Sequence, residues 1–530
     1  MLRKLKDSLP KQAASLAIAV ALLTSPCVRA EQVNPAERGE PAEFSQADIA
    51  AAVQEIERIA NEVANKRSYF EQDYRPISFR VTFSPEERLL YFDTDERMGP
   101  EAGYTDMIDM TNNIETAAQD LIEPLVGNMG PVWRYGGRDS DWWMDRGLNR
   151  GGPASSYLPH SRGEASLRID PASATGPVVL TGGHGFYYNH GQKRWTSQRD
   201  VVNGVLEDDI TQLMANELES HLATKRIQVT NLRRLKAGSP HQESGQEWWR
   251  LGVRYHIESL YPDLRDVWNS SPNAKYATRE RDEDLRSRPL YANHLKAKAL
   301  LQIHTNANED VSSTGARAYI HSGRPEDKKL ASLVLCSMSE MIHSVDEFAT
   351  YSVPAVPNFH DKHAETSFAK VPAVIVEVGF HTNPDDVKYL TNPLFKYKAM
   401  AGVAKGYRLY RDGRTCAPFK IASDQAADVV VWGRGKLPIA FGGNPDFPIK
   451  LITQKLDCPT CQPMHSSVWD AAAVERTRIE HACRPEDLAH SPIRYQVSAI
   501  DAYGVKSNSV TYTFNCKPRQ AHKQRIRRHS

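Results

Sequence analysis

The run Ala373-Val374-Ile375-Val376-Glu377-Val378-Gly379-Phe380 is short and apolar and carries one acidic side chain near its end. Two other runs have the same form. Pro177-Val178-Val179-Leu180 leads into Gly182-Gly183-His184-Gly185, and Leu300-Leu301-Gln302-Ile303 leads into His304. Apolar runs of this length predict buried strands. In an open α/β sheet, sites form outside the carboxyl ends of the strands. Two histidines and a glutamate at one sheet edge favour a zinc hydrolase.

The pattern around these runs predicts the fold class of residues 173–413. Strands alternate there with amphipathic helical segments. The expected strands are 177–181, 227–230, 299–304 and 373–378, and the expected helices are about 207–223, 326–343 and 393–410. Alternation of strands and helices predicts an α/β domain, with a mostly parallel sheet and helices on both faces.

The rest of the 530-residue chain is long enough for about two further domains. An N-terminal α+β accessory region is expected over 31–172, with helices at 45–67 and 110–125 and a hairpin over 77–92. Its role has no interpretation from the sequence. Residues 131–170 are predicted to be a loop-rich bridge. The three tryptophans of this bridge are expected to pack at a domain junction, with stacking on sugar rings as the alternative: Trp133, Trp142 and Trp143.

Short strand-like runs follow from about residue 420. They are 429–432, 439–441, 449–452, 493–500 and 510–514, and turn residues separate them. This pattern predicts a small C-terminal β-sandwich over 420–517. Residues 493–516 resemble fibronectin type III or immunoglobulin-like modules.

The N-terminus predicts export. Basic residues precede the apolar stretch Ala13 to Leu23, and Val28-Arg29-Ala30 follows it. This order predicts a secretory signal peptide over 1–30 and a periplasmic or secreted protein. The stretch is too short for a comfortable membrane span, and no later segment is long and apolar enough to cross a membrane.

The cysteines beyond the predicted leader come in an even number, which favours disulfides in an exported protein. The alternative is a metal site at Cys458 and Cys461, with His465, His481 and Cys483 nearby. Cys336 lies in an apolar helical pattern, so we expect it either to pair with Cys416 or to be buried as a thiol.

The charge of the chain argues against a nucleic-acid partner but allows a contact between the C-terminal tail and an anionic polymer. The formal net charge is +1, so no global field would recruit nucleic acid. Basic residues do collect in the last segment, 518–530, which we predict to be a disordered tail. Such a tail could contact an anionic envelope polymer, although a merely solvated tail is the simpler interpretation.

Four residues are candidates for the chemistry. A catalytic zinc takes three protein ligands and keeps one position open. His184 and His304 follow predicted strands and supply two imidazoles. Glu207 opens a predicted helix and is the candidate carboxylate ligand, with Asp208 and Asp209 as competitors. Glu377 ends an apolar strand, where a carboxylate is costly unless it has a function. It would serve as general base toward a water molecule.

These motifs occur in an order that resembles a known family. Val179 to Gly185, Glu207 at the next helix, Tyr291 to Asn306, and Pro372 to Asn383 are similar to the zinc-dependent N-acetylmuramoyl-L-alanine amidases of the Amidase_3 type. The resemblance covers about 173–412. It implies zinc as cofactor, peptidoglycan as substrate, and cleavage of the amide between N-acetylmuramic acid and L-alanine. By position, the family's zinc ligands fall on His184, Glu207 and His304, and its catalytic glutamate falls on Glu377.

The sequence departs from the family pattern in four places, one of which is Gln302, where the family usually has a small serine. Thr181 and Gly182 stand where the family has aspartate and proline, and the gap from His184 to Glu207 is longer than usual. An insertion at about 238–283 is rich in aromatic residues: Trp248, Trp249, Tyr255, Tyr261 and Trp268. It could build a glycan-binding lip or cover a sheet edge. Two functions compete with the amidase, a zinc peptidase acting on cell-wall peptides and an inactive peptidoglycan-binding protein.

Overall fold

The computed structural model describes residues 45–65, 76–86, 89–95, 104–126, 130–139, 176–361, 363–458 and 461–519. The predicted signal peptide, Trp142, Trp143 and all but the first two residues of the predicted tail lie outside these ranges.

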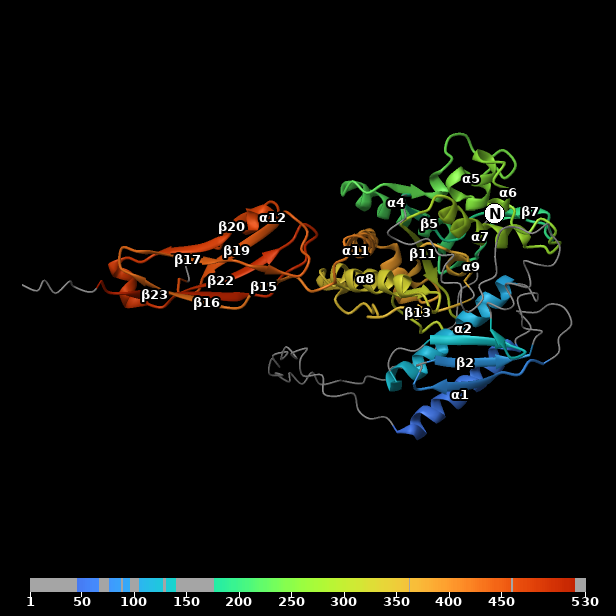
Figure 1. Cartoon of the computed structure of the whole chain (residues 1–530), viewed down its shortest axis with the longest axis horizontal. Coiled ribbons are helices and arrows are strands. Elements are labelled where there is room, and N and C mark those ends of the chain that lie inside the picture. The colour runs from blue at the N-terminus through green and yellow to red at the C-terminus, as the bar shows by residue number, and fades with distance from the viewer. Residues whose placement is uncertain are drawn as a thin grey trace, which may run out of the picture. The chain divides into compact units, whose positions relative to one another are not determined.

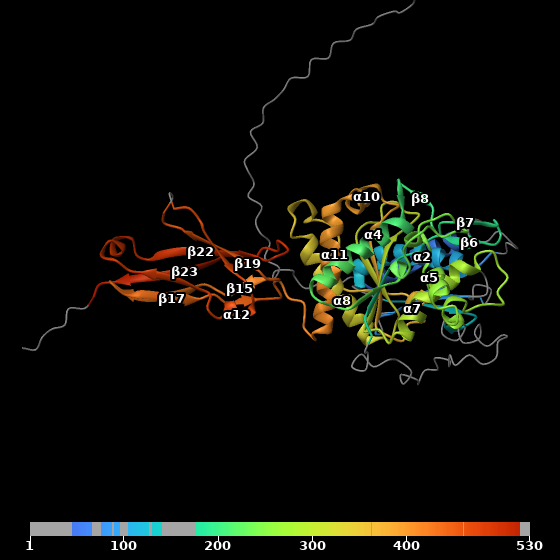
Figure 2. The same ribbon diagram turned by 90° about the horizontal axis from the view of Figure 1, so that it is seen from above.

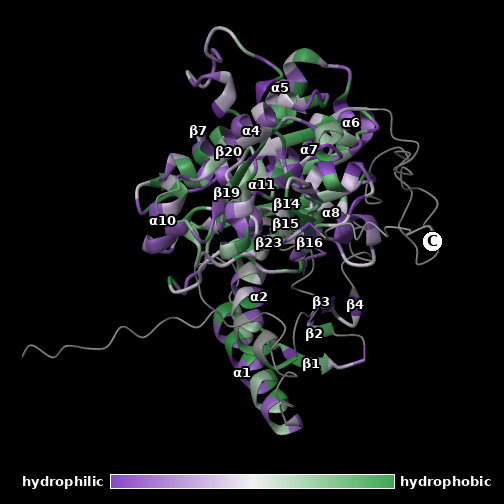
Figure 3. Ribbon diagram, turned by 90° about the vertical axis from the view of Figure 1, so that its left-hand side faces the viewer, coloured by the Kyte–Doolittle hydropathy of each residue, from purple (hydrophilic) through white to green (hydrophobic). Residues whose placement is uncertain are grey.

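The N-terminal region contains two helices and a four-stranded sheet of order β1-β2-β3-β4 (Figure 1). Its elements are α1 Gln46–Ala64, β1 Arg80–Ser84, β2 Leu89–Thr94, α2 Tyr104–Val126, β3 Gly130–Tyr135 and β4 Arg138–Asp139. The predicted hairpin is confirmed, since β1 pairs antiparallel with β2. Helix α1 carries both hydrophobic and hydrophilic residues along its length, as expected of a helix with one buried side (Figure 3).

The prediction of loop structure at the start of 131–170 is wrong. Residues 130–139 form β3 and β4 because Pro131, Trp133 and Tyr135 alternate with less buried neighbours, and β3 pairs parallel with β2. The many Gly, Asp and Arg residues of 131–170 had suggested loops. Trp133 is 2% exposed and stacks on Phe92 at 4.5 Å, so it packs in the core of this region.

The central region is built on a six-stranded sheet of order β10-β5-β11-β14-β12-β13. The strands are β5 Val178–Gly182, β10 Val229–Asn231, β11 Ala299–Asn306, β12 Arg317–Ile320, β13 Asn358–Phe359 and β14 Ala373–Phe380. Strands β10, β5, β11 and β14 run parallel, which confirms the four predicted strands and the mostly parallel sheet. The sheet is mixed at one edge, because the unpredicted strand β12 pairs antiparallel with β14.

Helices cover both faces of this sheet, as the alternation predicted. They are α4 Glu207–Thr224, α5 Val253–Leu260, α6 Arg265–Trp268, α7 Arg279–His294, α8 Pro325–Ile342, α9 Ala364–Ser367, α10 Pro384–Thr391 and α11 Pro393–Arg411. Helices α4, α8 and α11 pack into one core with one face of the sheet (Figure 2). Helices α5, α6 and α7 pack into a second core on the other face.

Alternation along the strands decides which residues reach each core. Leu301 and Ile303 of β11 belong to the core with α4, α8 and α11, whereas Leu300 belongs to the core with α5, α6 and α7. Because side chains alternate between the faces of a strand, His304 and Glu377 lie on the α7 face, at the carboxyl end of the sheet.

The C-terminal region consists mainly of β-strands, and their buried side chains form a core cluster. A five-stranded sheet of order β16-β23-β22-β19-β20 is joined by the pairs β17–β21 and β15–β18. The strands are β15 Lys420–Ile421, β16 Gln425–Val430, β17 Arg434–Pro438, β18 Phe441–Gly442, β19 Ile449–Lys455, β20 Met464–Val468, β21 Arg478–Ala482, β22 Ile493–Ile500 and β23 Val510–Lys517, with the short helix α12 Ala471–Val474. The predicted strand at 439–441 overlaps β18 only at Phe441, and β15, β17, β20 and β21 were not predicted. The likeness to fibronectin or immunoglobulin modules stays a prediction.

Three disulfides join the cysteines of the described chain: Cys336–Cys416, Cys458–Cys461 and Cys483–Cys516. The expectation of bridges is confirmed, and Cys336 pairs rather than remaining a buried thiol. Within the described ranges, no helix has both the length and the apolar character that a membrane crossing requires.

Candidate metal centre

Three of the four predicted site residues come together at the carboxyl edge of the sheet. One ligand atom each from His184, Glu207 and His304 lies within 4.8 Å of the others. They come from the loop after β5, the first residue of α4, and β11. All three are buried, with exposed fractions of 5%, 2% and 4%. Two imidazoles and one carboxylate suit zinc in both softness and number, and leave a coordination position for water or substrate.

The backbone around His184 is unusual. His184 has φ of 64°, in the left-handed region that non-glycine residues rarely adopt, and Gly185 follows with φ of 128°. Gly183 also has a steric role, because a Cβ there would lie 2.4 Å from atoms of the His304 ring. The glycines therefore let the loop turn sharply and let the second imidazole approach. A positive φ at a residue other than glycine strains the backbone. Such strain persists where the surrounding structure enforces it, often at functional sites.

Sheet register brings His304 beside Glu377. The two residues are direct partners in the parallel pair β11–β14, and the register shifts just beyond, between His304 and Asn306. Because partners on adjacent strands point to the same face, both side chains enter one pocket. This pocket has a volume of about 400 Å³, and His184 and Glu207 line it as well.

The structure shows which of the three consecutive acids, Glu207, Asp208 and Asp209, faces the two imidazoles. Oε1 of Glu207 lies 3.3 Å from Nε2 of His184 and 3.2 Å from Nδ1 of His304. Asp208 instead accepts backbone N–H groups of Gly185 and Gln198, which ties the loop after β5 to α4. Asp209 pairs with the guanidinium of Arg250 at 2.8 Å. Only Glu207, of the three consecutive acids, faces both imidazoles.

Burial and charge set the protonation of the cluster. Burial, aided by the positive charge of Arg199, lowers the pKa of His184 to about 3, so its imidazole is neutral at pH 7. Burial alone would raise the pKa of Glu207, but His184 and His304 outweigh it and hold that pKa well below its usual range. Burial likewise opposes a charged His304, yet the carboxylates of Glu365, Glu207 and Glu377 raise its pKa to about 10. The carboxylates around His304 therefore favour positive charge at this position.

Glu377 is a buried carboxyl group with an unsatisfied oxygen. It is 7% exposed, and its Oε2 has no hydrogen-bond partner among the described residues. Burial, opposed by His304 and reinforced by the negative charges of Glu207 and Glu365, raises the pKa of Glu377 to about 8. An unpartnered, proton-holding group in a pocket beside potential metal ligands has the properties of a general base or acid.

Four residues that were not predicted from the sequence form a hydrogen-bonded network with the two histidines. Two of them contact the ring nitrogens that do not face Glu207. Glu365 Oε1 accepts from His304 Nε2 at 3.0 Å and from Arg288 at 2.5 Å. Arg288 also donates to Asp284 at 2.7 Å. Gln198 completes the chain of contacts, since it donates to Asp284 at 2.8 Å and its Oε1 lies 3.3 Å from His184 Nδ1.

The outer network, which consists of Gln198, Asp284, Arg288 and Glu365, sets the orientation of the two imidazole rings. With Nδ1 of His184 facing Gln198, its Nε2 faces Glu207, and with Nε2 of His304 facing Glu365, its Nδ1 faces Glu207. Hydrogen bonds of this kind fix ring orientation and tautomer in histidine metal sites. No sequence motif marks Glu365, because it lies in the short helix α9, far along the chain from either histidine.

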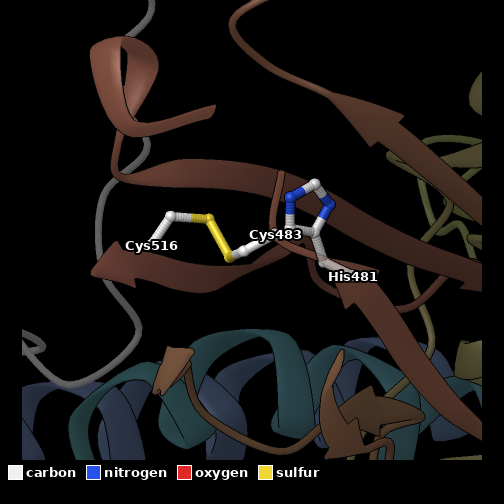
Figure 4. Close-up of side chains that lie close together, drawn as sticks. All are labelled: His481, Cys483 and Cys516. Atoms are coloured by element: carbon white, nitrogen blue, oxygen red, sulfur yellow. A yellow bond between two sulfur atoms is a disulfide. The ribbon is translucent and has the colours of Figure 1, made fainter. Parts of the chain in front are cut away.

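A second group of potential donors, in the C-terminal region, does not form a metal site. His481 lies close to Cys483 and Cys516. Figure 4 shows that the two sulfur atoms are bonded to each other, with the His481 ring beside them. A disulfide offers no thiolate, and His481 is hydrogen bonded to the Tyr495 hydroxyl at 2.9 Å. The alternative of a metal at Cys458 and Cys461 fails for the same reason, because these cysteines are also joined.

Comparison with known proteins gives three findings. The profile of the family described as N-acetylmuramoyl-L-alanine amidase, Amidase_3, matches residues 260–408. The germination-specific N-acetylmuramoyl-L-alanine amidase of Bacillus subtilis (strain 168) is 26% identical over 133 residues, which cover 25% of this chain and 53% of that protein. The chain thus spans about half the length of this curated relative.

Among solved structures, the CwlD amidase from Clostridioides difficile, in complex with the GerS lipoprotein, has a TM-score of 0.31 and 19% identity. That match covers 45% of this chain and 99% of the other. The amidase Ami1 from Mycobacterium smegmatis has a TM-score of 0.30 and 14% identity, covering 46% and 99%.

This region is an α/β domain built on one sheet. At the sheet edge, two buried imidazoles and a carboxylate form a group that could hold a metal ion. Residues 260–408 match the family described as N-acetylmuramoyl-L-alanine amidase, Amidase_3, which is the family that the sequence motifs resemble. The matched residues include His304 and Glu377. His184 and Glu207 lie before them in the chain, and the fold brings them to the same pocket.

Proposed function

We propose that this chain is an exported, zinc-dependent N-acetylmuramoyl-L-alanine amidase, which hydrolyses the amide between N-acetylmuramic acid and L-alanine in peptidoglycan. One observation carries the proposal. The His184, Glu207 and His304 cluster shares a pocket with the unpartnered carboxyl group of Glu377, inside a domain of the amidase family.

Zinc fits the residues present. His184 Nε2, a carboxylate oxygen of Glu207 and His304 Nδ1 would hold it, because these atoms converge and the outer network orients both rings. A zinc ion bound there would polarise the scissile carbonyl and make a nearby water more acidic. The positive charge would also favour the ionised form of Glu377.

Glu377 performs the proton transfers in this proposal. Its carboxylate takes a proton from water as the water oxygen attacks the amide carbon. The carbon–nitrogen bond then breaks, and Glu377 gives the proton to the departing L-alanine nitrogen. A buried group whose pKa lies near 8 is suited to both steps, because proton transfer is efficient when the pKa is close to the working pH.

Export and domain roles complete the proposal. Three disulfides favour an oxidising compartment, which agrees with the predicted leader at 1–30 and with peptidoglycan as substrate. We assign catalysis to 173–413, an accessory role to 31–172, and a wall-positioning role to the β region 420–517. The basic tail at 518–530 would contact an anionic envelope polymer.

The zinc affinity of the protein is expected to rise with pH. The pKa of His304 is raised to about 10, so the free imidazole carries both protons at neutral pH. Zinc needs the lone pair of Nδ1, so binding displaces a proton. Below pH 10 each added pH unit should strengthen binding by up to about tenfold through this group. Chelator competition between pH 6 and 9 measures the slope, and a flat profile would contradict this assignment.

The proposed activity is tested by digestion of purified peptidoglycan with the zinc-loaded mature protein, followed by mass spectrometry. We expect free stem peptides that begin with L-alanine, together with intact glycan strands, and no products after zinc is removed. Fragments cut only within peptides would overturn the proposal in favour of a peptidase. Bound zinc without any products would favour a non-catalytic peptidoglycan-binding protein.

A further inference from the structure

A second cavity lies beside the metal centre, and nothing in the proposed reaction uses it. Its volume is about 890 Å³, within the range of roughly 300–1,000 Å³ that is common for small-molecule sites. Two stretches that depart from the family pattern form most of it. One is the hairpin of β6 Tyr187–Asn189 and β7 Arg194–Thr196, and the other is the aromatic insertion at about 238–283.

Aromatic rings form one wall of this cavity, and Trp195 lies at the centre of them. Its ring is 4.8 Å from Tyr255, 5.8 Å from Tyr188 and 5.0 Å from His241. His241 in turn lies 5.1 Å from Trp248. Tyr255 and Trp248 are buried, whereas Trp195 and Tyr188 are half-buried at the cavity wall. The wall therefore offers half-buried aromatic surface rather than a sealed core.

The charged side chains of the cavity are largely satisfied by the protein itself. Arg254 pairs with Glu280 at 2.8 Å and donates to the Trp268 carbonyl at 3.1 Å. Glu280 also accepts from the Tyr255 hydroxyl at 2.6 Å. Lys236 lies over the Trp248 ring, with its Nζ 4.5 Å from the centroid. A strongly anionic ligand would find few free cations here.

The remaining polar groups favour a neutral ligand that carries many hydroxyl or amide groups. Gln242, Glu243, Glu258 and Asn269 line the cavity and offer planar donors and acceptors. Trp268 also lines it, and its buried Nε1 has no hydrogen-bond partner among the described residues. Pyranose rings combine one apolar face, which packs on indole or phenol rings, with equatorial polar groups at the rim. That chemistry matches this wall.

Two elements connect the cavity with the metal centre. Trp195 precedes Gln198 by three residues, so their Cα atoms are at most about 11 Å apart, and Gln198 contacts His184. Helix α7 contributes Glu280 to the cavity and Leu285 to the metal pocket, and these positions lie about 7.5 Å apart along the helix. The two sites are therefore built partly from the same two segments, residues 195–199 and helix α7.

We infer that this aromatic cavity is a saccharide subsite, which binds N-acetylated sugar residues of the glycan strand next to the muramoyl residue whose amide is cut. The inference rests on the proposed amidase function for the identity of its ligand. The scissile bond joins a glycan to a peptide, so an enzyme that holds the glycan on one side keeps the lactyl amide near Glu377.

The test uses the zinc-loaded full-length mature chain and triacetylchitotriose, a soluble N-acetylglucosamine oligomer without lactyl or peptide groups. Calorimetry should detect binding to the wild-type protein, and Trp195→Ala should weaken it by about tenfold or more, through loss of the central stacking ring. Tyr397→Ala is the matched control, because Tyr397 is 40% exposed on α11 and lines neither cavity. It should bind as the wild type does.

Trp195→Phe, which keeps an aromatic ring, should retain most of the affinity and provides a variant if Trp195→Ala fails to fold. In the wild-type protein the Trp195 indole NMR resonance should shift on titration with the oligomer. Absence of binding, or binding that leaves this resonance and the Trp195 variants unchanged, would overturn the subsite. Peptidoglycan digestion is scored separately. If the protein binds the oligomer through Trp195 but releases no stem peptides, the subsite inference stands and the proposed amidase activity is overturned.

Discussion

Replacing Glu377 with glutamine is expected to lower the rate of stem-peptide release by about 10²–10⁴-fold, the usual contribution of a positioned general acid–base group. Glutamine keeps the size of the side chain, which is 7% exposed and lies on β14 beside its register partner His304. It cannot take a proton from water or give one to the leaving nitrogen. Rates on purified peptidoglycan, measured with each protein loaded with zinc, give the comparison.

The substitution should leave the zinc content unchanged, because Glu377 is not in the cluster of converging ligand atoms. Glu347→Gln is a matched control, since Glu347 is exposed and lies outside the pocket, and it should behave as the wild type does. Retained activity in Glu377→Gln would remove this residue from the mechanism. Loss of zinc from the same variant would instead assign Glu377 to the metal.

Replacing Glu207 with glutamine is expected to weaken zinc binding by more than the roughly 10–100-fold that loss of an outer hydrogen-bond partner costs. The carboxylate faces both His184 and His304, so its removal deletes a ligand and the negative charge that balances the cation. Equilibrium dialysis against a calibrated chelator measures the affinity, and thermal melting with and without zinc reports whether the metal still stabilises the fold.

Asp209→Asn is the control for this second experiment. Asp209 lies two residues further along α4 and pairs with Arg250, so zinc affinity should not change. The opposite pattern, with full zinc occupancy in Glu207→Gln and loss in Asp209→Asn, would transfer the ligand role to the alternative that the sequence left open.

Much of the site could be predicted because three strands carry it. The apolar runs at 177–181, 299–304 and 373–378 predict buried strands, and parallel strands end at the same sheet edge. That argument places His184, His304 and Glu377 near one another without coordinates. The ligand role of Glu207 was less certain, because three acids follow one another at the start of a helix. Only the contacts that each acid makes in the folded protein distinguish them.

The misjudged parts of the fold have local causes. The many Gly, Asp and Arg residues of 131–170 suggested loops, yet β3 forms because its buried residues alternate and β2 offers a parallel partner. Strand β12 went unnoticed since its four residues give little periodicity, and its antiparallel pairing with β14 depends on the sheet already being assembled.

The sequence by itself determined the α/β class, the strands that carry the site, and the chemical character of the candidate ligands, because short-range periodicity and residue type encode all three. The tertiary structure alone decided which acid faces the imidazoles, which disulfides form, and how Glu365 and Gln198 orient the two rings. It alone showed that the aromatic insertion lines a cavity. These features depend on contacts between residues that are far apart in the chain, and distances of that kind are fixed only when the cores on both faces of the sheet have packed.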